Sequence, residues 1–116
     1  MKIKQLFLII PLALLFITSS CGKTIKPSED SNNKKALSEI QKEPKIKHAT
    51  ITDDNILYAS VEDDGTIRNG YAEYLCEILK ENNATTNWVK IVKVNSSKDL
   101  NSGDDHGILL GEANCN

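Results

Sequence analysis

Cysteines and histidines are the residues of this chain that most readily support chemistry. Cys21 closes an apolar run, whereas Cys76 and Cys115 lie in the second half of the chain. A nucleophilic cysteine needs an activating base, and neither His48 nor His106 belongs to a recognisable cysteine-enzyme motif. The sequence has no Cys-x-x-Cys pair, which argues against thioredoxin-type chemistry. We therefore expect a protein that is not an enzyme and has no catalytic residue.

Acidic clusters are the second chemical feature, and they lie at Asp53-Asp54, Glu62-Asp63-Asp64 and Asp104-Asp105. Oxygen ligands favour Ca²⁺, so these turns and His106 leave open a small calcium-binding module or a metal-dependent enzyme. No cluster has the alternating acids of an EF-hand loop, and the chain has no P-loop or zinc spacing. Aspartate is also common in ordinary turns. We expect no metal and no cofactor.

The first twenty residues have the layout of a targeting segment. Lys2 and Lys4 precede a twelve-residue apolar run at 6–17, and the small residues 18–20 lead to Cys21. That run is too short for a membrane-spanning helix, which needs about 20 residues. A positive start, a short apolar run and small residues are typical of a cleaved signal peptide.

The segment resembles a bacterial lipoprotein signal peptide, with Thr18-Ser19-Ser20-Cys21 as the lipobox. Leucine is commonest in that family where this chain has Thr18, whereas the following Gly22-Lys23 is similar to lipoproteins of Bacteroidota-type bacteria. The resemblance implies that Cys21 is lipidated and becomes the first mature residue, anchoring the chain in the cell envelope. It also implies outer-membrane placement, because no aspartate follows the cysteine. Plain secretion and an uncleaved anchor are the alternatives.

Charge is unevenly spread along the chain. Without Lys2 and Lys4 the net charge of −2 becomes −4, with +3 on residues 23–48 and −7 on residues 49–116. An acidic domain repels phosphates, so we expect no nucleic-acid partner. Residues 21–47 are rich in Lys, Ser, Asn and Glu, which predicts the lipidated cysteine followed by a disordered polar tether. A short helix at 34–43 is the alternative there.

The pattern changes from about residue 48, where a folded domain is predicted to span 48–116. Apolar alternation predicts strands at 56–62, 87–94 and 107–112, and a further short strand at 48–52. Residues 70–82 have one apolar face and predict a helix with Asn69 as its N-cap. We expect an α+β domain of order β-β-α-β-β, with three to four strands and one helix packed on one face.

Cys76 and Cys115 are predicted to form a disulfide. The domain is small for a self-sufficient core, and two cysteines in an exported protein favour a covalent link. Cys76 lies beside the apolar face of the predicted helix, and Cys115 follows the last strand. They meet if that strand runs under the helix, whereas unpaired thiols are the alternative.

The functional expectation is a membrane-anchored, non-enzymatic binding module of the envelope. Its membrane contact is the lipid on Cys21, and its candidate partner is an envelope protein. An exposed patch that includes Tyr58, Tyr74 or Trp88 would support this interpretation.

Overall fold

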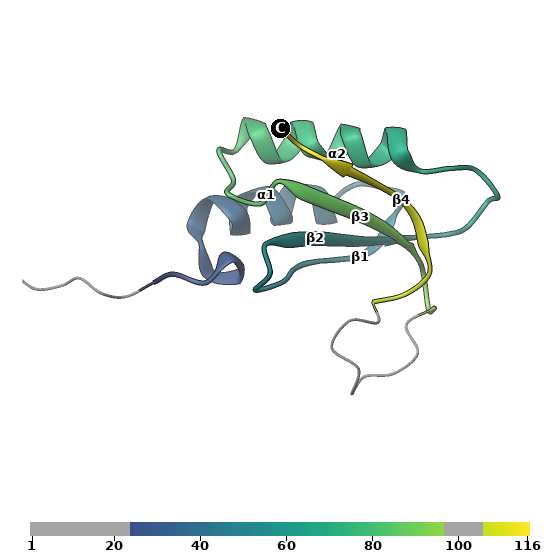
Figure 1. The fold of residues 1–116 in the computed structure, drawn as a ribbon, viewed down its shortest axis with the longest axis horizontal. Helices are drawn as coiled ribbons and strands as arrows, with labels where there is room; N and C mark the ends of the chain where they lie inside the picture. Colours follow the sequence, from purple (N-terminus) through teal and green to yellow (C-terminus); the bar gives the residue numbers. More distant parts are fainter. Residues whose placement is uncertain (1–23, 97–105) are drawn as a thin grey trace, which may run out of the picture.

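The computed structural model describes residues 24–96 and 106–116, which form a four-stranded sheet and two α-helices (Figure 1). Along the chain the elements are the 3₁₀ helix η1 (Pro27–Glu29), α1 (Ser31–Gln41), β1 (Ile46–Ile51), β2 (Ile56–Val61), α2 (Asn69–Glu81), β3 (Trp88–Lys93) and β4 (Leu109–Asn114). No helix among the described residues is long and apolar enough to cross a membrane.

The strands lie side by side in chain order, β1-β2-β3-β4. β1 and β2 are antiparallel, β2 and β3 are parallel, and β3 and β4 are antiparallel. The parallel pair is joined by α2, as expected because parallel neighbours need a crossover connection. The register places Thr50, Tyr58, Lys90 and Glu112 in one row across the sheet.

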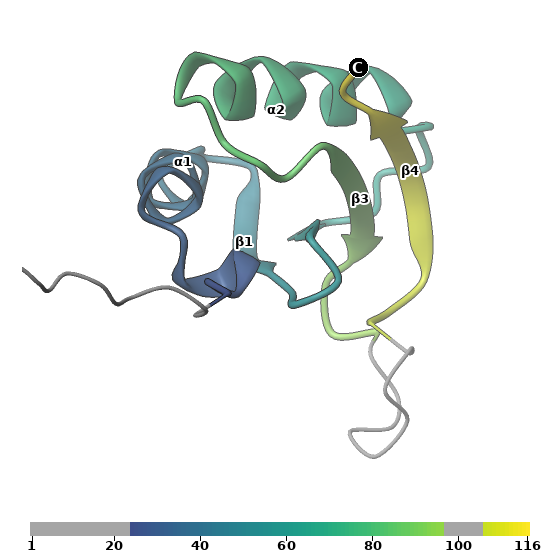
Figure 2. The same cartoon turned by 60° about the vertical axis from the view of Figure 1, so that its left-hand side comes forward.

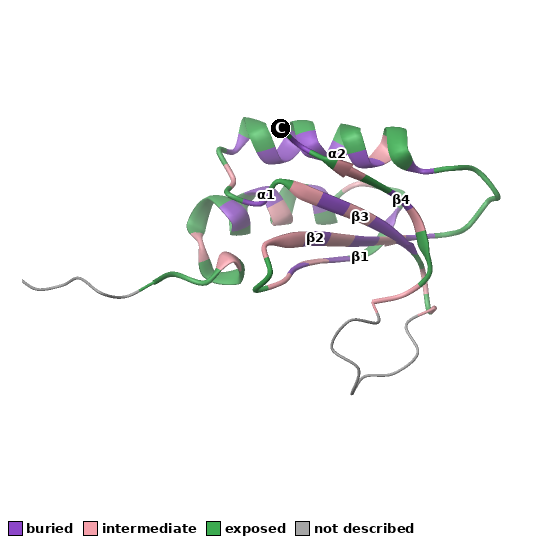
Figure 3. Ribbon diagram, in the orientation of Figure 1, coloured by how far each residue is buried: buried purple, intermediate pink, exposed green. Residues whose placement is uncertain are grey.

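Both helices cover the same face of the sheet. α1 packs on β1, α2 packs on β3 and β4, and the two helices also contact each other (Figure 2). Buried residues lie where the helices meet the sheet (Figure 3). Along β2, for example, Leu57, Ala59 and Val61 are buried, whereas the alternate residues are half-buried. The sheet therefore has a covered face and an open face.

The α+β class is confirmed, and the sheet has four strands, within the expected three to four. The expected order β-β-α-β-β matches the elements from β1 to β4, but the expectation of one helix is wrong because α1 precedes the strands and packs on the same sheet. The predicted disordered tether is wrong from Pro27 onward, where η1, α1 and the start of β1 lie. The folded part thus begins well before residue 48.

α1 is stabilised by an N-cap and by tertiary contacts with the core. Asp30 caps the helix, its side chain accepting from the Asn33 N–H at 2.9 Å. Ala36 and Ile40 are fully buried against the core. Such a short helix is marginal alone, so the packing of these residues on the sheet stabilises it.

Smaller differences concern element ends. The last strand is Leu109–Asn114 rather than 107–112, and Asn69 is the first residue of α2, with Arg68 as the N-cap. Gly111 explains the closeness of this segment to β4, because a Cβ there would overlap the backbone of Arg68 and Asn69. β4 therefore passes directly beneath the start of α2.

Candidate functional site

The predicted disulfide is present and links Cys76 in α2 to Cys115 just after β4. Both residues are buried, and their Cα atoms lie 5.2 Å apart. β4 runs beneath α2, which is the arrangement the pairing required. The link therefore fastens the C-terminal strand to the helix layer.

Other predicted site residues lie outside the described ranges. Cys21, the predicted lipidation site, and the Asp104-Asp105 cluster are both in this group. His106 is the first residue after the second undescribed range.

The two acidic turns within the described residues do not come together at one site. Asp53-Asp54 follows β1 and Glu62-Asp63-Asp64 follows β2, so they occupy opposite ends of the β1–β2 hairpin. Across residues 24–96 and 106–116, no three His, Cys, Asp or Glu side chains are grouped to hold a metal. The Asp63 carboxylate instead accepts from the N–H of Gly65, as expected of turn chemistry.

Asp64 has a more specific environment than the other acids. Its carboxylate accepts from the Thr66 hydroxyl at 2.6 Å and from the Thr66 N–H at 3.0 Å. These hydrogen bonds, chiefly that from the hydroxyl, lower the pKa of Asp64, and Arg68 contributes to the same direction. Arg68 Nη2 lies 3.4 Å from the carboxylate. Asp64 is therefore an anion that partners an arginine.

The open sheet face carries an aromatic and cationic cluster. The Lys90 ammonium lies 4.5 Å from the centroid of the Trp88 ring and 5.9 Å from that of Tyr58. Trp88 Nε1 donates to Glu112 at 3.1 Å. These side chains occupy adjacent strands and are partly exposed. Cation–π contacts of this kind contribute about 0.5–1 kcal/mol at exposed sites, so the cluster orders the surface.

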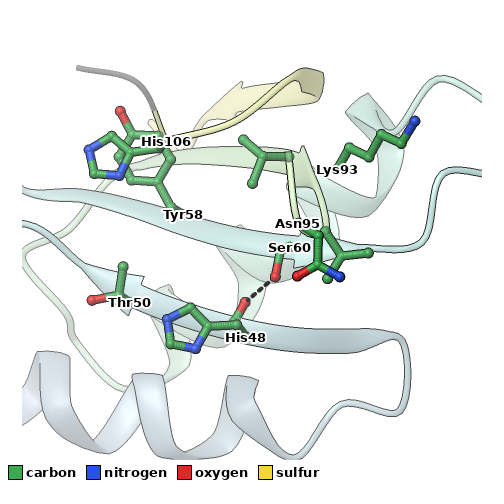
Figure 4. Close-up of a pocket in the computed structure, with 9 residues that line it drawn as sticks. His48, Thr50, Tyr58, Ser60, Lys93, Asn95 and His106 are labelled. Carbon is green, nitrogen blue, oxygen red and sulfur yellow. Dashed lines mark hydrogen bonds between the residues drawn. The ribbon is translucent and has the colours of Figure 1, made fainter. Parts of the chain in front are cut away.

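Beside this cluster lies a hollow of about 340 Å³ (Figure 4). The His106 ring stacks on Tyr58 with centroids 3.9 Å apart, and Ser60 donates to the His48 carbonyl oxygen at 3.3 Å. The lining residues come from β1, β2 and the end of β3, namely His48, Thr50, Tyr58, Ser60, Val92, Lys93, Val94 and Asn95, with His106 from beyond. The lining combines hydroxyl, imidazole, ammonium and amide groups with apolar side chains, so it offers a partner both hydrogen bonds and apolar contact.

The sheet edges offer less room for a partner. Along β4, the Leu110 carbonyl oxygen accepts from the Arg68 N–H at 3.0 Å, and the Glu112 N–H donates to Asn69 Oδ1 at 3.0 Å. Along β1, the Ala49 carbonyl oxygen accepts from Gln41 Nε2 at 3.2 Å. Edge groups that are bonded in this way are not available to a further strand.

The sequence indicates only part of this surface. Tyr58 and Trp88 lie on the open face, whereas Tyr74 lies on α2 and donates to Glu43 at 3.0 Å. The hollow-lining residues Thr50 and Ser60 were not singled out. Alternation along each strand indicates which face each residue lies on. Whether Thr50 and Ser60 line the same hollow depends on the register between the strands.

Comparison with known protein families, curated proteins and solved structures finds no match to this chain. Its candidate function therefore rests on the signal-like segment and on the geometry described above.

Proposed function

We propose that this protein is a lipid-anchored envelope protein, attached to the outer membrane through Cys21, that binds an envelope protein with its open sheet face. It acts as a non-enzymatic binding module. The carrying observation is that both helices cover one face, while the other presents a hollow of about 340 Å³ beside an aromatic cluster. Partly exposed aromatic side chains next to a hollow are common features of protein-binding surfaces.

The chemistry of the hollow favours binding over catalysis. Its described lining contains two histidines and three hydroxyl residues, and none of the described lining residues is a carboxylate or a thiol. His106 contacts the Tyr58 ring, and the carbonyl oxygen of His48 accepts from Ser60. A catalytic histidine needs a reacting partner and an orienting group. These neighbours instead support a surface for contact.

Membrane attachment is tested by fractionation of a bacterial host that expresses the full chain. Wild-type protein should sediment with outer membranes and carry acyl chains in its intact mass, starting at Cys21. Cys21→Ser should lose the acyl mass and the membrane fraction together. A wild-type protein without lipid would refute the anchor, and a lipidated protein in the inner membrane would refute the outer-membrane assignment.

The binding face is tested by site-specific photo-crosslinking in the same host. A photoreactive amino acid at Ser60, in the hollow, should yield a discrete adduct with one envelope protein. The matched control position is Glu77, which is exposed on α2, on the opposite side of the sheet. Adducts of equal yield from both positions, or from neither, would contradict the assigned face.

A further inference from the structure

We propose that a second pocket, at the start of α2, binds a small soluble oxyanion, either a carboxylate or a phosphate group. The pocket has a volume of about 250 Å³ and lies apart from the hollow of the open face. Three cationic residues line it: Lys45, Lys47 and Arg68. Glu62 and Asp64 are its acidic lining residues.

Arg68 is the centre of this site because it is buried and rigidly held. Its residue is 8% exposed. Its N–H donates to the Leu110 carbonyl oxygen, and its own carbonyl oxygen accepts from the Ala72 N–H, both at 3.0 Å. Gly111 permits the close approach of β4 to this backbone. These bonds fix the backbone of Arg68, and its side chain is held by burial and by the hydrogen bond from Nη2 to the Glu62 carbonyl oxygen.

The partners of the Arg68 guanidinium leave its positive charge only partly compensated. Nη2 donates to the Glu62 carbonyl oxygen at 2.9 Å and lies 3.4 Å from the Asp64 carboxylate. Nε is buried and has no hydrogen-bond partner among the described residues. The Asp64 side chain is 60% exposed, so solvent screens its attraction. A buried guanidinium is stable only when well paired, and a bound oxyanion would supply that pairing.

The beginning of α2 adds positive potential at the same place. Arg68 is the N-cap of this thirteen-residue helix, which has no side-chain cap and no acid in its first turn. The N-terminal end of a helix carries a partial positive charge that favours anions. An arginine at that end is unfavourable by the same rule. The helix and the guanidinium thus both favour a ligand of negative charge.

Lys45 and Lys47, which lie at the start of β1, also line the pocket and add two cationic residues to its lining. Lys45 Nζ lies 5.7 Å from the centroid of the Tyr71 ring. The Tyr71 hydroxyl is a second buried polar group without a partner in the described residues. In this arrangement the Asp64 carboxylate makes the ion pair with Arg68 that a bound oxyanion would make. An incoming oxyanion therefore displaces the Asp64 carboxylate from the guanidinium.

The test is calorimetric titration of the full chain, in non-ionic detergent, with sodium phosphate in one arm and sodium acetate in the other. Sodium chloride at matched ionic strength is the reference. We expect saturable binding of at least one oxyanion, and the arm that binds more tightly assigns the ligand as phosphate or carboxylate. Lys45→Gln should weaken that binding about three- to fivefold, in line with the energy of one partly exposed charge pair.

Asp64→Asn is the deciding variant. If Asp64 competes with an oxyanion for Arg68, its removal strengthens oxyanion binding, whereas it does not if Arg68 serves only as the ion-pair partner of Asp64. Removing a competing carboxylate should tighten oxyanion binding about three- to fivefold. Lys80→Gln, which changes an exposed lysine in the last turn of α2 that lines neither pocket, is the matched control and should leave the affinity unchanged. Heat equal to that of chloride, or an Asp64→Asn affinity that is unchanged or weaker, would overturn the proposal. Crosslinking from Ser60 does not depend on this pocket, so the two proposals can fail separately.

Discussion

Asn33 in α1 is hydrogen-bonded in both directions to Thr85, which lies 52 residues further along the chain. Asn33 Oδ1 accepts from the Thr85 N–H at 2.8 Å, and Asn33 Nδ2 donates to Thr85 Oγ1 at 2.9 Å. The same carboxamide also bonds the Pro27 carbonyl oxygen and the Thr86 N–H. Asn33 is 1% exposed. This buried polar group is therefore well satisfied and ties α1 to the segment that leads into β3.

Replacing Asn33 by alanine should lower the free energy of unfolding by about 2–3 kcal/mol. The change leaves the backbone N–H groups of Thr85 and Thr86 without this acceptor, and an unsatisfied buried donor costs about 1–3 kcal/mol. Urea unfolding followed by circular dichroism measures the loss.

Asn32→Ala is the matched control for that variant. Asn32 is exposed and makes one bond outside its helix, from Nδ2 to the Asn83 carbonyl oxygen at 3.2 Å. Its replacement should change stability by about 0.5 kcal/mol or less. Equal losses in the two variants would show that the buried network has no special importance.

Loss of the disulfide should destabilise the domain by about 4 kcal/mol. The link joins residues 39 positions apart, and chain-entropy arithmetic for that loop gives this value. The Cys76→Ala/Cys115→Ala double variant and the reduced wild-type protein should unfold at similar, much lower urea concentrations. Alkylation of Cys76 or Cys115 without reductant would contradict the pairing.

Two glycine-to-alanine changes should act in opposite directions. Gly111→Ala places a Cβ against the backbone of Arg68 and Asn69, which cannot yield cheaply, so we expect a loss of about 2 kcal/mol or more. Gly70 lies in the first turn of α2. Apart from its chain neighbours and its own helical backbone, no atom of the described residues lies within 4 Å of the place that an alanine methyl group would take. Gly70→Ala should stabilise by up to about 1 kcal/mol. Thermal unfolding distinguishes them, and destabilisation by both would contradict the space around Gly70.

Tyr71 should make the protein less stable at alkaline pH. Burial raises the pKa of its hydroxyl, and the Glu43 carboxylate raises it further. The unfolded chain ionises its tyrosines near pH 10. The stabilising contribution is therefore complete below about pH 10 and is lost as the pH rises through the higher pKa of the folded state.

Tyr71→Phe removes this titration, so its unfolding free energy should fall less steeply than that of wild type above pH 10. At pH 7 the unfolding free energy of the variant should lie no more than about 0.5 kcal/mol below that of wild type, because the buried hydroxyl has no partner in the described structure. Urea unfolding from pH 7 to 11 measures both effects. Identical slopes for the two proteins would contradict the role of Tyr71.

The sequence by itself was sufficient for the elements with strong local patterns. Alternation along 56–61 and the apolar face of 69–81 each specify an element through its own periodicity, so both were predicted within a residue or two. The pairing of Cys76 with Cys115 followed from the small number of cysteines and the expected size of the core. These properties depend on neighbouring residues or on simple counting.

The tertiary structure alone decided the role of α1 and the composition of both pockets. α1 is polar except for a few residues such as Ala36 and Ile40. These residues stabilise the helix only because it packs on β1, where they are buried. Lys45 and Arg68 meet only because β1 and the start of α2 lie at the same end of the sheet. Long-range pairing is set by the sum of many weak contacts, which no single stretch of sequence displays.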